Sequence, residues 1–262
     1  MAGSFHLTFL GTGTSVGVPV IGCDCAVCTS GDPRNRRTRA SIHLEAGGHS
    51  LLVDSGPDLR EQALREKLTR VDAVLYTHAH VDHVAGFDEL RAFCWRRDDP
   101  LPLHGNRQTL DILGQMYPWA FSPDNVYKGY VKPAPVLLDG PFGIGSLKIT
   151  PLPVVHGNIE THGFLFDHPG YPPIAYIPDV KEIPTTTREL LRNVDILILD
   201  SLRPDPHPTH LSLAEAMAMI GEIEPGQAWL THLGHENDHA ALAAGLPPQV
   251  HVAHDGLKLP AF

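Results

Sequence analysis

The sequence predicts an α/β protein (α+β in four layers) built as an αββα sandwich, in which two packed β-sheets carry helices on their outer faces. Three observations lead to this prediction. Short apolar segments of strand length recur between glycine and proline residues, and stretches with helical periodicity lie between several of them. The early strands follow one another directly, whereas the later strands alternate with helices.

The chain has 262 residues, 42% of them hydrophobic, so it can bury a sizeable core, and we expect a single domain over residues 1–262. In chain order, the expected strands are FHLTFLG (5–11), ASIHLEA (40–46), SLLVDSG (50–56), DAVLYTH (72–78), LKITPLPVV (147–155), GFLFDH (163–168), IAYIPD (174–179), VDILILD (194–200), QAWLTH (227–232) and VHVAHDG (250–256). The expected helices span residues 57–68, 83–96, 106–116, 186–192, 211–222 and 236–244. Ser212 and Glu215 fit a capping box at the start of the fifth helix.

Residues 117–130, YPWAFSPDNVYKGY, interrupt this order and are rich in aromatic side chains. Two interpretations remain open. The segment is either a long loop held down by its own side chains, or a rim that stacks on a substrate ring or meets a second subunit.

The overall charge limits the classes of partner. Acidic residues outnumber basic residues by 30 to 20, and the formal charge of -10 argues against binding to nucleic acid polymers. No run of about eighteen apolar residues is present, and the start MAGSFHLTFLGTG lacks the features of a secretion signal. We therefore expect a cytoplasmic protein without a membrane partner.

The segment YTHAHVDH carries the strongest functional signal. Directly after an apolar strand it places His78, His80, Asp82 and His83, which are all ligand types for a borderline divalent metal. Histidines can also cap helices or pack in a core, but this combination at this spacing favours metal binding.

This HxHxDH motif after a strand resembles the signature of the metallo-β-lactamase superfamily. The resemblance implies that His78, His80 and His156 hold one metal, that Asp82, His83 and His232 hold a second, and that Asp179 bridges the two. It also implies that Asp54, in LLVDSGPD, lies behind the ligands and accepts a hydrogen bond from a ligating imidazole. The alternative role for Asp54 is that of a turn residue.

Three cysteines, Cys23, Cys25 and Cys28, lie within GCDCAVC. A local disulfide, a CxxC redox pair and three quarters of a metal site are the alternatives, and a reducing compartment favours the metal site. The stretch LGTGTSVGVPVIGCDCAVC resembles the beginning of PhnP-type phosphodiesterases, and PqqB-like proteins begin similarly. The resemblance implies a structural zinc whose fourth ligand is His235, with His239 as the next candidate.

The segment HPTHLSLAEAMAMI contributes the expected proton donor. By resemblance to the phosphodiesterase branch of the superfamily, His210 points towards the metals and protonates the leaving oxygen, and His207 is the less favoured substitute. Besides the metal ligands, we therefore expect His210, Asp82 and Asp54 to serve catalysis. An imidazole suits proton transfer because it ordinarily titrates near neutral pH.

Together these features predict a binuclear phosphodiesterase. The resemblance to PhnP-type enzymes implies that it hydrolyses small, including cyclic, phosphodiesters such as ribosyl cyclic phosphate or cyclic nucleotides. The expected cofactors are two active-site divalent metals, zinc or manganese, and one structural zinc; the expected assembly is a homodimer. Two alternatives remain: a transfer-RNA processing endonuclease of the same superfamily, which should carry a basic surface, and a PqqB-like metal protein that is not a hydrolase.

Overall fold

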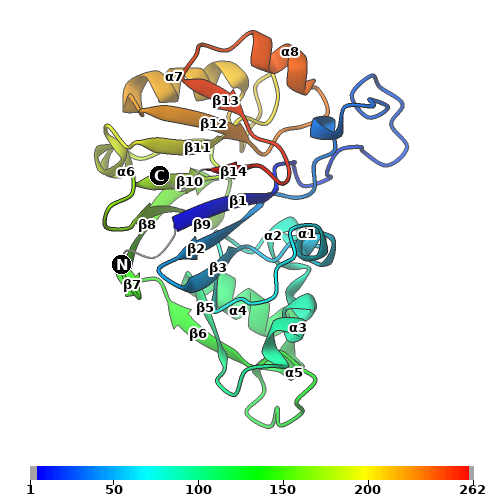
Figure 1. The fold of residues 1–262 in the computed structure, drawn as a ribbon, viewed down its shortest axis with the longest axis vertical. Helices are drawn as coiled ribbons and strands as arrows, with labels where there is room; N and C mark the ends of the chain where they lie inside the picture. Colours follow the sequence, from blue (N-terminus) through cyan, green and yellow to red (C-terminus); the bar gives the residue numbers. More distant parts are fainter. Residues whose placement is uncertain (1–4, 260–262) are drawn as a thin grey trace.

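The computed structural model describes residues 5–259, which form two mixed β-sheets flanked by helices (Figure 1). The first sheet has the strand order β14-β1-β2-β3-β4-β5-β6, and the second has the order β13-β12-β11-β10-β9-β8-β7. The strands of the first sheet are β1 (Phe5–Gly11), β2 (Ser41–Ala46), β3 (His49–Val53), β4 (Ala73–Leu75), β5 (Leu101–Gly105), β6 (Pro133–Leu137) and β14 (Lys258–Leu259). Those of the second are β7 (Phe142–Ile144), β8 (Leu147–His156), β9 (Ile159–Asp167), β10 (Ile174–Ile177), β11 (Ile196–Asp200), β12 (Gln227–Thr231) and β13 (Val250–Val252).

The inner faces of the two sheets pack against each other. Along β11, Ile196 and Ile198 point into the core between the sheets, whereas Leu197 and Leu199 point to the outer face. Because side chains alternate along a strand, an unbroken apolar run such as ILIL means that both faces of the strand are covered.

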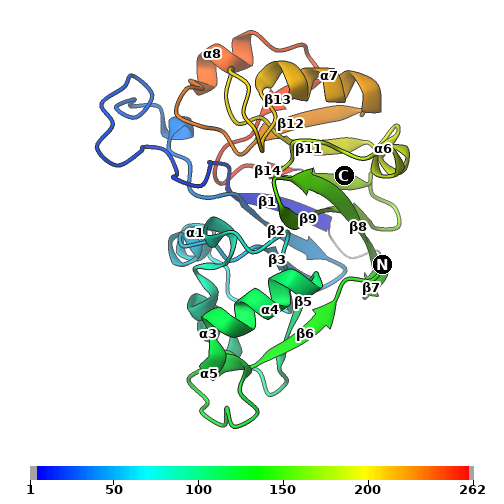
Figure 2. The same ribbon diagram turned by 180° about the vertical axis from the view of Figure 1, so that it is seen from behind.

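The helices supply that outer cover (Figure 2). The helices over the first sheet are α1 (Leu59–Arg65), α2 (Val81–Val84), α3 (Arg91–Cys94), α4 (Arg107–Met116) and α5 (Pro118–Phe121). Those over the second are α6 (Thr185–Leu191), α7 (Leu213–Ile223) and α8 (His239–Ala244). The predicted αββα sandwich is thus confirmed, and Ser212 and Glu215 form the expected capping box at the start of α7.

Strand direction determines where functional residues gather. Strands β3 to β6 run parallel to one another, and so do β10 to β13. In open sheets of this kind, ligands bind beyond the carboxyl ends of the parallel strands. The segments that follow β3, β4, β10 and β12 contain Asp54, His78, Asp179 and His232 respectively.

The prediction of one helix over residues 83–96 is wrong. The chain forms α2, then a 3-10 turn (Phe87–Leu90), then α3. The break lies at Gly86, where a Cβ atom would be 2.0 Å from the carbonyl oxygen of Gly56. Only glycine permits this approach, which seats α2 directly on the turn after β3.

Strands β5, β6 and β7 were not expected from the sequence. Strand β6, PAPVL, contains Pro133 and Pro135 and lies at the edge of its sheet. Proline cannot donate a backbone hydrogen bond to a neighbouring strand and is found mainly on edge strands. A segment with two prolines therefore does not match the usual sequence pattern of a strand.

The aromatic segment divides into two parts. The ring of Tyr117 stacks on Phe87 with centroids 4.5 Å apart, and its hydroxyl donates to the carbonyls of Val84 and Ala85. This half anchors the segment next to α2, as the first interpretation requires. The second half is open to solvent, and Tyr127 is 64% exposed.

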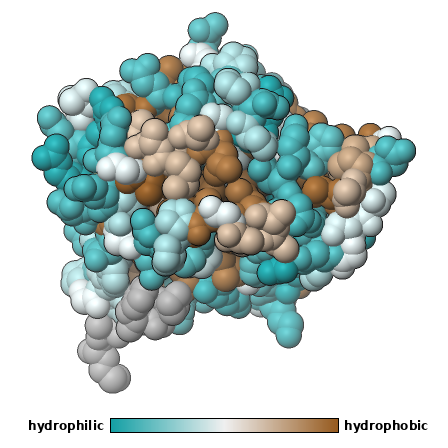
Figure 3. Space-filling model, turned by 90° about the horizontal axis from the view of Figure 1, so that it is seen from above, coloured by the Kyte–Doolittle hydropathy of each residue, from teal (hydrophilic) through white to brown (hydrophobic). Residues whose placement is uncertain are grey.

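The end of the molecule that carries α7 and α8 displays apolar residues among polar ones (Figure 3). The exposed side of these helices includes several alanines, among them Ala214, Ala218, Ala241 and Ala244. Alanine has the highest helix propensity, which accounts for its frequency here without burial. Among the described helices, none has both the length and the apolar character needed to cross a bilayer.

Candidate metal centre

Two groups of metal-ligand side chains meet in the structure at the carboxyl ends of the strands. The first group is His78, His80 and His156, whose ligand atoms lie within 4.8 Å of one another. His78 Nε2 lies 2.8 Å from His80 Nδ1, and His156 Nε2 lies 3.2 Å from the same atom. Three ring nitrogens therefore converge on one point.

The second group is Asp82, His83 and His232, with Asp179 between the two groups. His83 Nε2 lies 3.2 Å from Asp82 Oδ2 and 3.3 Å from Asp179 Oδ2. The other Asp179 oxygen, Oδ1, lies 3.2 Å from His232 Nε2 and 3.8 Å from His156 Nε2. The carboxylate of Asp179 therefore reaches ligands of both groups.

These spacings suit divalent cations. Two nitrogen or oxygen ligands at about 2.0 Å from a tetrahedral zinc are separated by about 3.3 Å. Several buried atoms that face this space have no hydrogen-bond partner in the described chain, namely His83 Nε2, His232 Nε2 and Asp179 Oδ2. An unpaired buried polar atom is costly, and a bound cation would satisfy all three.

The electrostatics of the two groups differ. Burial lowers the pKa of His78 well below its ordinary value and that of His156 to about 4, so both rings are neutral, the form that binds metal. Burial acts on His83 and His232 as well, but the nearby carboxylates, with Asp179 foremost, outweigh it. They raise the pKa of His83 well above its ordinary value and that of His232 to about 9. The second group thus attracts positive charge.

Asp54 lies behind the second group. Its Oδ2 accepts from His83 Nδ1 at 2.8 Å, and both of its oxygens accept from Thr77, one from the backbone N–H and one from the hydroxyl. Asp54 is fully buried and has φ of 63°, in the left-handed region, as His232 has with φ of 57°. Such backbone strain is typical of functional sites. Asp54 orients the ring of His83 so that Nε2 faces the centre.

His210 lies beside the metal-ligand groups. Its ring stacks on that of His232 at 4.6 Å and meets that of His156 edge-on at 4.6 Å. Its Nδ1 donates to Asp200 Oδ2 over 2.8 Å. His207, in contrast, contacts Thr209 through its Nδ1. Of the two histidines, His210 has the carboxylate partner and the place next to the ligands.

Asp200 is a functional candidate that sequence reasoning missed. It ends β11 and is fully buried, and its Oδ2 also accepts from the backbone N–H of Val180. Its sequence context, DILILD, reads simply as the end of a core strand. The available signal was a carboxylate at a strand end ten residues before His210.

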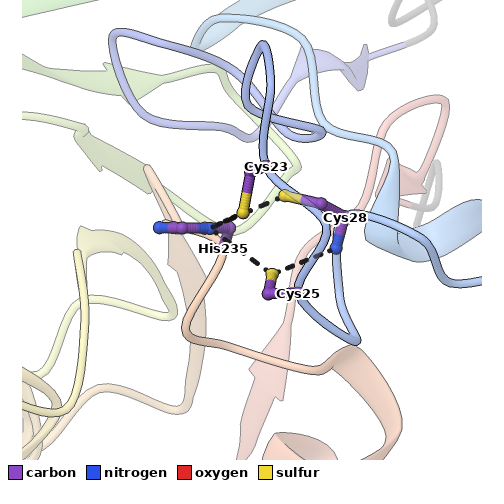
Figure 4. Close-up of side chains that lie close together, drawn as sticks. All are labelled: Cys23, Cys25, Cys28 and His235. Carbon is purple, nitrogen blue, oxygen red and sulfur yellow. Dashed lines mark hydrogen bonds between the residues drawn. The ribbon is translucent and has the colours of Figure 1, made fainter.

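A second cluster lies in the loop that projects from the body of the molecule. Cys23, Cys25 and Cys28 surround His235, which belongs to the segment after β12 (Figure 4). The distances from His235 Nδ1 to the three sulfur atoms are 3.3, 3.5 and 3.6 Å. Tetrahedral zinc, with bonds of about 2.3 Å to sulfur and 2.0 Å to nitrogen, separates these atoms by about 3.5 Å. His239 contacts His254 and the Asn35 side chain instead.

The thiols themselves are unequal. The backbone N–H of Cys28 donates to Cys25 Sγ and lowers the pKa of Cys25 to about 6, whereas burial raises that of Cys28 to about 11. Zinc binds cysteine as the thiolate, so a bound cation would favour loss of the Cys28 proton. The residue types and their spacing fit a closed zinc site.

The buried Arg37 ties this loop to the segment that carries both His232 and His235. Its guanidinium donates to the carbonyls of Gly234 and Asn237 at 3.1 and 2.8 Å, and to the Asn35 side chain. Arg37 is only 1% exposed, and these contacts join the loop to the segment beside the metal-ligand groups.

Comparisons with known proteins agree with this geometry. Residues 49–233 match the β-lactamase superfamily domain. A protein solved as a new diphosphatase from the PhnP family shares 38% sequence identity with this chain. The two structures superpose with a TM-score of 0.88, over 98% of this chain and 97% of that one. Zinc-bound PqqB from Methylobacterium extorquens is 24% identical with a TM-score of 0.79, over 97% of this chain and 99% of that one, and shows the shared fold.

Curated relatives bear more varied names. An octanoyltransferase of Porphyromonas gingivalis is 36% identical over 95% of this chain, but the chain spans only 50% of that protein's length. The coenzyme PQQ synthesis protein B of Methylobacterium radiotolerans is 28% identical, over 97% of this chain and 99% of that protein. A domain match over most of the chain and the full-length similarity to the diphosphatase point the same way: this protein is a metal-dependent hydrolase of the metallo-β-lactamase superfamily and belongs to its PhnP family.

Proposed function

We propose that the protein is a cytoplasmic binuclear phosphodiesterase that hydrolyses small, including cyclic, phosphodiesters. The observation that carries this proposal is the arrangement of Asp179, whose Oδ1 lies near His156 of one set and whose two oxygens lie near His232 and His83 of the other, next to a histidine that is held by a carboxylate. Such a site can clamp both the attacking and the leaving oxygen of a phosphoryl group.

Each set of side chains would hold its own ion. His78, His80 and His156 would hold one ion; Asp82, His83 and His232 would hold the other; and Asp179 would contact both. When bound, zinc or manganese ions acidify water and withdraw charge from the phosphoryl group. The remaining side chains orient these ligands. Asp54 holds His83, and the carbonyl of Thr209 accepts from His156 Nδ1 at 2.8 Å.

His210 would supply the proton for the leaving oxygen. Because its Nδ1 donates to Asp200, its Nε2 is the atom from which a proton can be delivered. The carboxylate of Asp200 fixes the orientation of the His210 ring through this hydrogen bond. Lys181 steadies the same segment, since its Nζ donates to Glu215 Oε1 at 2.6 Å and to the His210 carbonyl at 3.3 Å.

Replacing His210 by alanine should leave metal binding intact and lower kcat by about 10²–10⁴-fold on diesters with poor leaving groups. Asp200→Asn should show the same pattern more weakly, because it leaves the imidazole in place without its charge partner. Both variants should approach wild-type rates as the pKa of the leaving group falls. An equal loss on good and poor leaving groups would contradict the role of His210 as proton donor.

The metal content tests the proposal directly. Purified protein should contain three ions per chain: one resistant to mild chelation, held by the cysteine cluster, and two that exchange. Elemental analysis before and after chelation, with rates on bis(p-nitrophenyl) phosphate measured in parallel, should show activity lost with the exchangeable pair and restored with it. Full activity with a single ion per chain would exclude a binuclear centre.

Hydrolysis of a diphosphate linkage is a second candidate function. It is favoured by the 38% identical PhnP-family relative, which is a diphosphatase. Cleavage of transfer-RNA precursors has less support, because the acidic charge of -10 opposes binding of a polyanion. Rates on a cyclic nucleotide, a diphosphate ester and a precursor transfer RNA, measured side by side, distinguish these activities.

A further inference from the structure

His207 lies next to the proposed proton donor and has no role in the mechanism above. Its ring centroid is 5.2 Å from that of His210, whose own ring is 4.6 Å from those of His156 and His232. His207 therefore stands one ring further from the metal ligands than His210, the proposed proton donor to the leaving oxygen.

The hydrogen bonds of His207 define its tautomer. The backbone N–H of Thr209 donates to His207 Nδ1 at 3.3 Å, and the Thr209 hydroxyl lies 3.2 Å from the same atom. A backbone N–H can only donate, so Nδ1 is an acceptor and the ring proton resides on Nε2. Within residues 5–259, no partner is found for Nε2, and the residue is partly exposed. His207 thus presents a fixed N–H donor to whatever occupies the adjacent space.

The surroundings of His207 add a positive charge. Arg203 donates from Nε to the Asp205 carbonyl at 3.4 Å and from Nη2 to the Pro206 carbonyl at 3.2 Å, so it braces the loop that carries His207. No described carboxylate lies within ion-pair distance of Arg203, and its charge is not neutralised there. Lys181, the other nearby cation, is paired with Glu215. In a chain with formal charge -10, this cation would add to the positive charge of the proposed metals for an anionic group.

We propose that His207 is a substrate-binding residue whose Nε2–H donates to a phosphoryl oxygen of the leaving group, so that the site prefers diphosphate esters to simple diesters. This inference rests on the proposed metal-dependent phosphoester hydrolysis. In the reaction, the oxygen of water bonds to the attacked phosphorus and the bridging P–O bond breaks. The bridging oxygen and its electron pair leave with the second phosphoryl group and take the proton of His210 Nε2, and the proton that water loses passes to solvent, from which His210 is reprotonated. The departing phosphoryl group accepts from His207 and lies near the charge of Arg203.

Steady-state kinetics on two substrates tests this assignment. ADP-ribose contains a diphosphate linkage, whereas bis(p-nitrophenyl) phosphate has no second phosphoryl group. With manganese-loaded enzyme, His207→Ala should lower kcat/KM for ADP-ribose by about 10- to 100-fold, the loss expected for one hydrogen bond to a charged group, and leave bis(p-nitrophenyl) phosphate unchanged. His207→Gln should retain most of the activity on ADP-ribose, since its amide N–H can replace Nε2–H. His49→Ala is the matched control, because His49 begins β3 at the end opposite Asp54.

The outcomes separate this inference from the proposed function. An equal loss on both substrates would show that His207 acts only by holding Thr209, and would overturn the inference. Wild-type enzyme that cleaves bis(p-nitrophenyl) phosphate but not ADP-ribose would also overturn it, with the proposed function intact. A metal-loaded enzyme inactive on both would remove the proposed function and the inference with it.

Discussion

Replacing Asp179 by alanine is expected to reduce phosphodiesterase activity by a factor on the order of 10³ or more, because both of its oxygens face metal-ligand sets. The change removes a carboxylate whose oxygens lie 3.3 Å from His83 Nε2 and 3.2 Å from His232 Nε2. Asp82 would then be the remaining carboxylate beside the Nε2 atoms of those two rings, and the charge that favours cation binding there would be smaller. Activity on bis(p-nitrophenyl) phosphate and the number of exchangeable ions per chain should fall together.

The control for this experiment is Asp195→Ala. Asp195 is an exposed acidic residue just before β11, at the opposite end of the strand from Asp200. The Asp195→Ala variant should retain both exchangeable ions and the wild-type rate on bis(p-nitrophenyl) phosphate. If Asp179→Ala keeps two exchangeable ions and near-normal activity, Asp179 does not bridge the centre.

Cys25→Ser and His235→Ala are each expected to remove the chelator-resistant ion and to lower the melting temperature by about 5–10 °C. For a chain of this size, such a shift corresponds to a few kcal/mol of stability. The loss should be smaller than the roughly 10–16 kcal/mol of structural zinc in isolated zinc-finger peptides, since this protein has a large core of its own. Elemental analysis and thermal unfolding measure the two effects.

The same variants should weaken binding of the exchangeable ions without touching their ligands. His235 lies three residues after His232, and Arg37 binds the backbone between Gly234 and Asn237. Cys94→Ala is the control, because Cys94 is a buried thiol on α3 outside the cluster. Loss of the tight ion in Cys25→Ser but not in His235→Ala would exclude His235 as the fourth ligand.

The local sequence pattern was sufficient to predict those strands and helices whose formation depends on residues close to one another in the chain. The apolar run at 196–199 identifies a strand covered on both faces, and Ser212 with Glu215 marks a helix start, because a few adjacent residues determine each feature. Where local pattern failed, distant contacts decided the outcome. Gly56 packs against Gly86 and breaks the expected helix over 83–96. The prolines of β6 are tolerated because that strand lies at an edge.

The sequence by itself determined the ligand types and the motif order, since HxHxDH after a strand, the cysteine cluster and the later histidines and aspartate are all visible in the chain. Only the tertiary structure brought His235 to the thiols of a loop more than two hundred residues earlier, and Asp200 to His210. It also decided which nitrogen of His207 carries the proton. The physical reason is that the type of a residue determines which groups its side chain can bind. Which partner the side chain meets depends on how the two sheets and their loops pack.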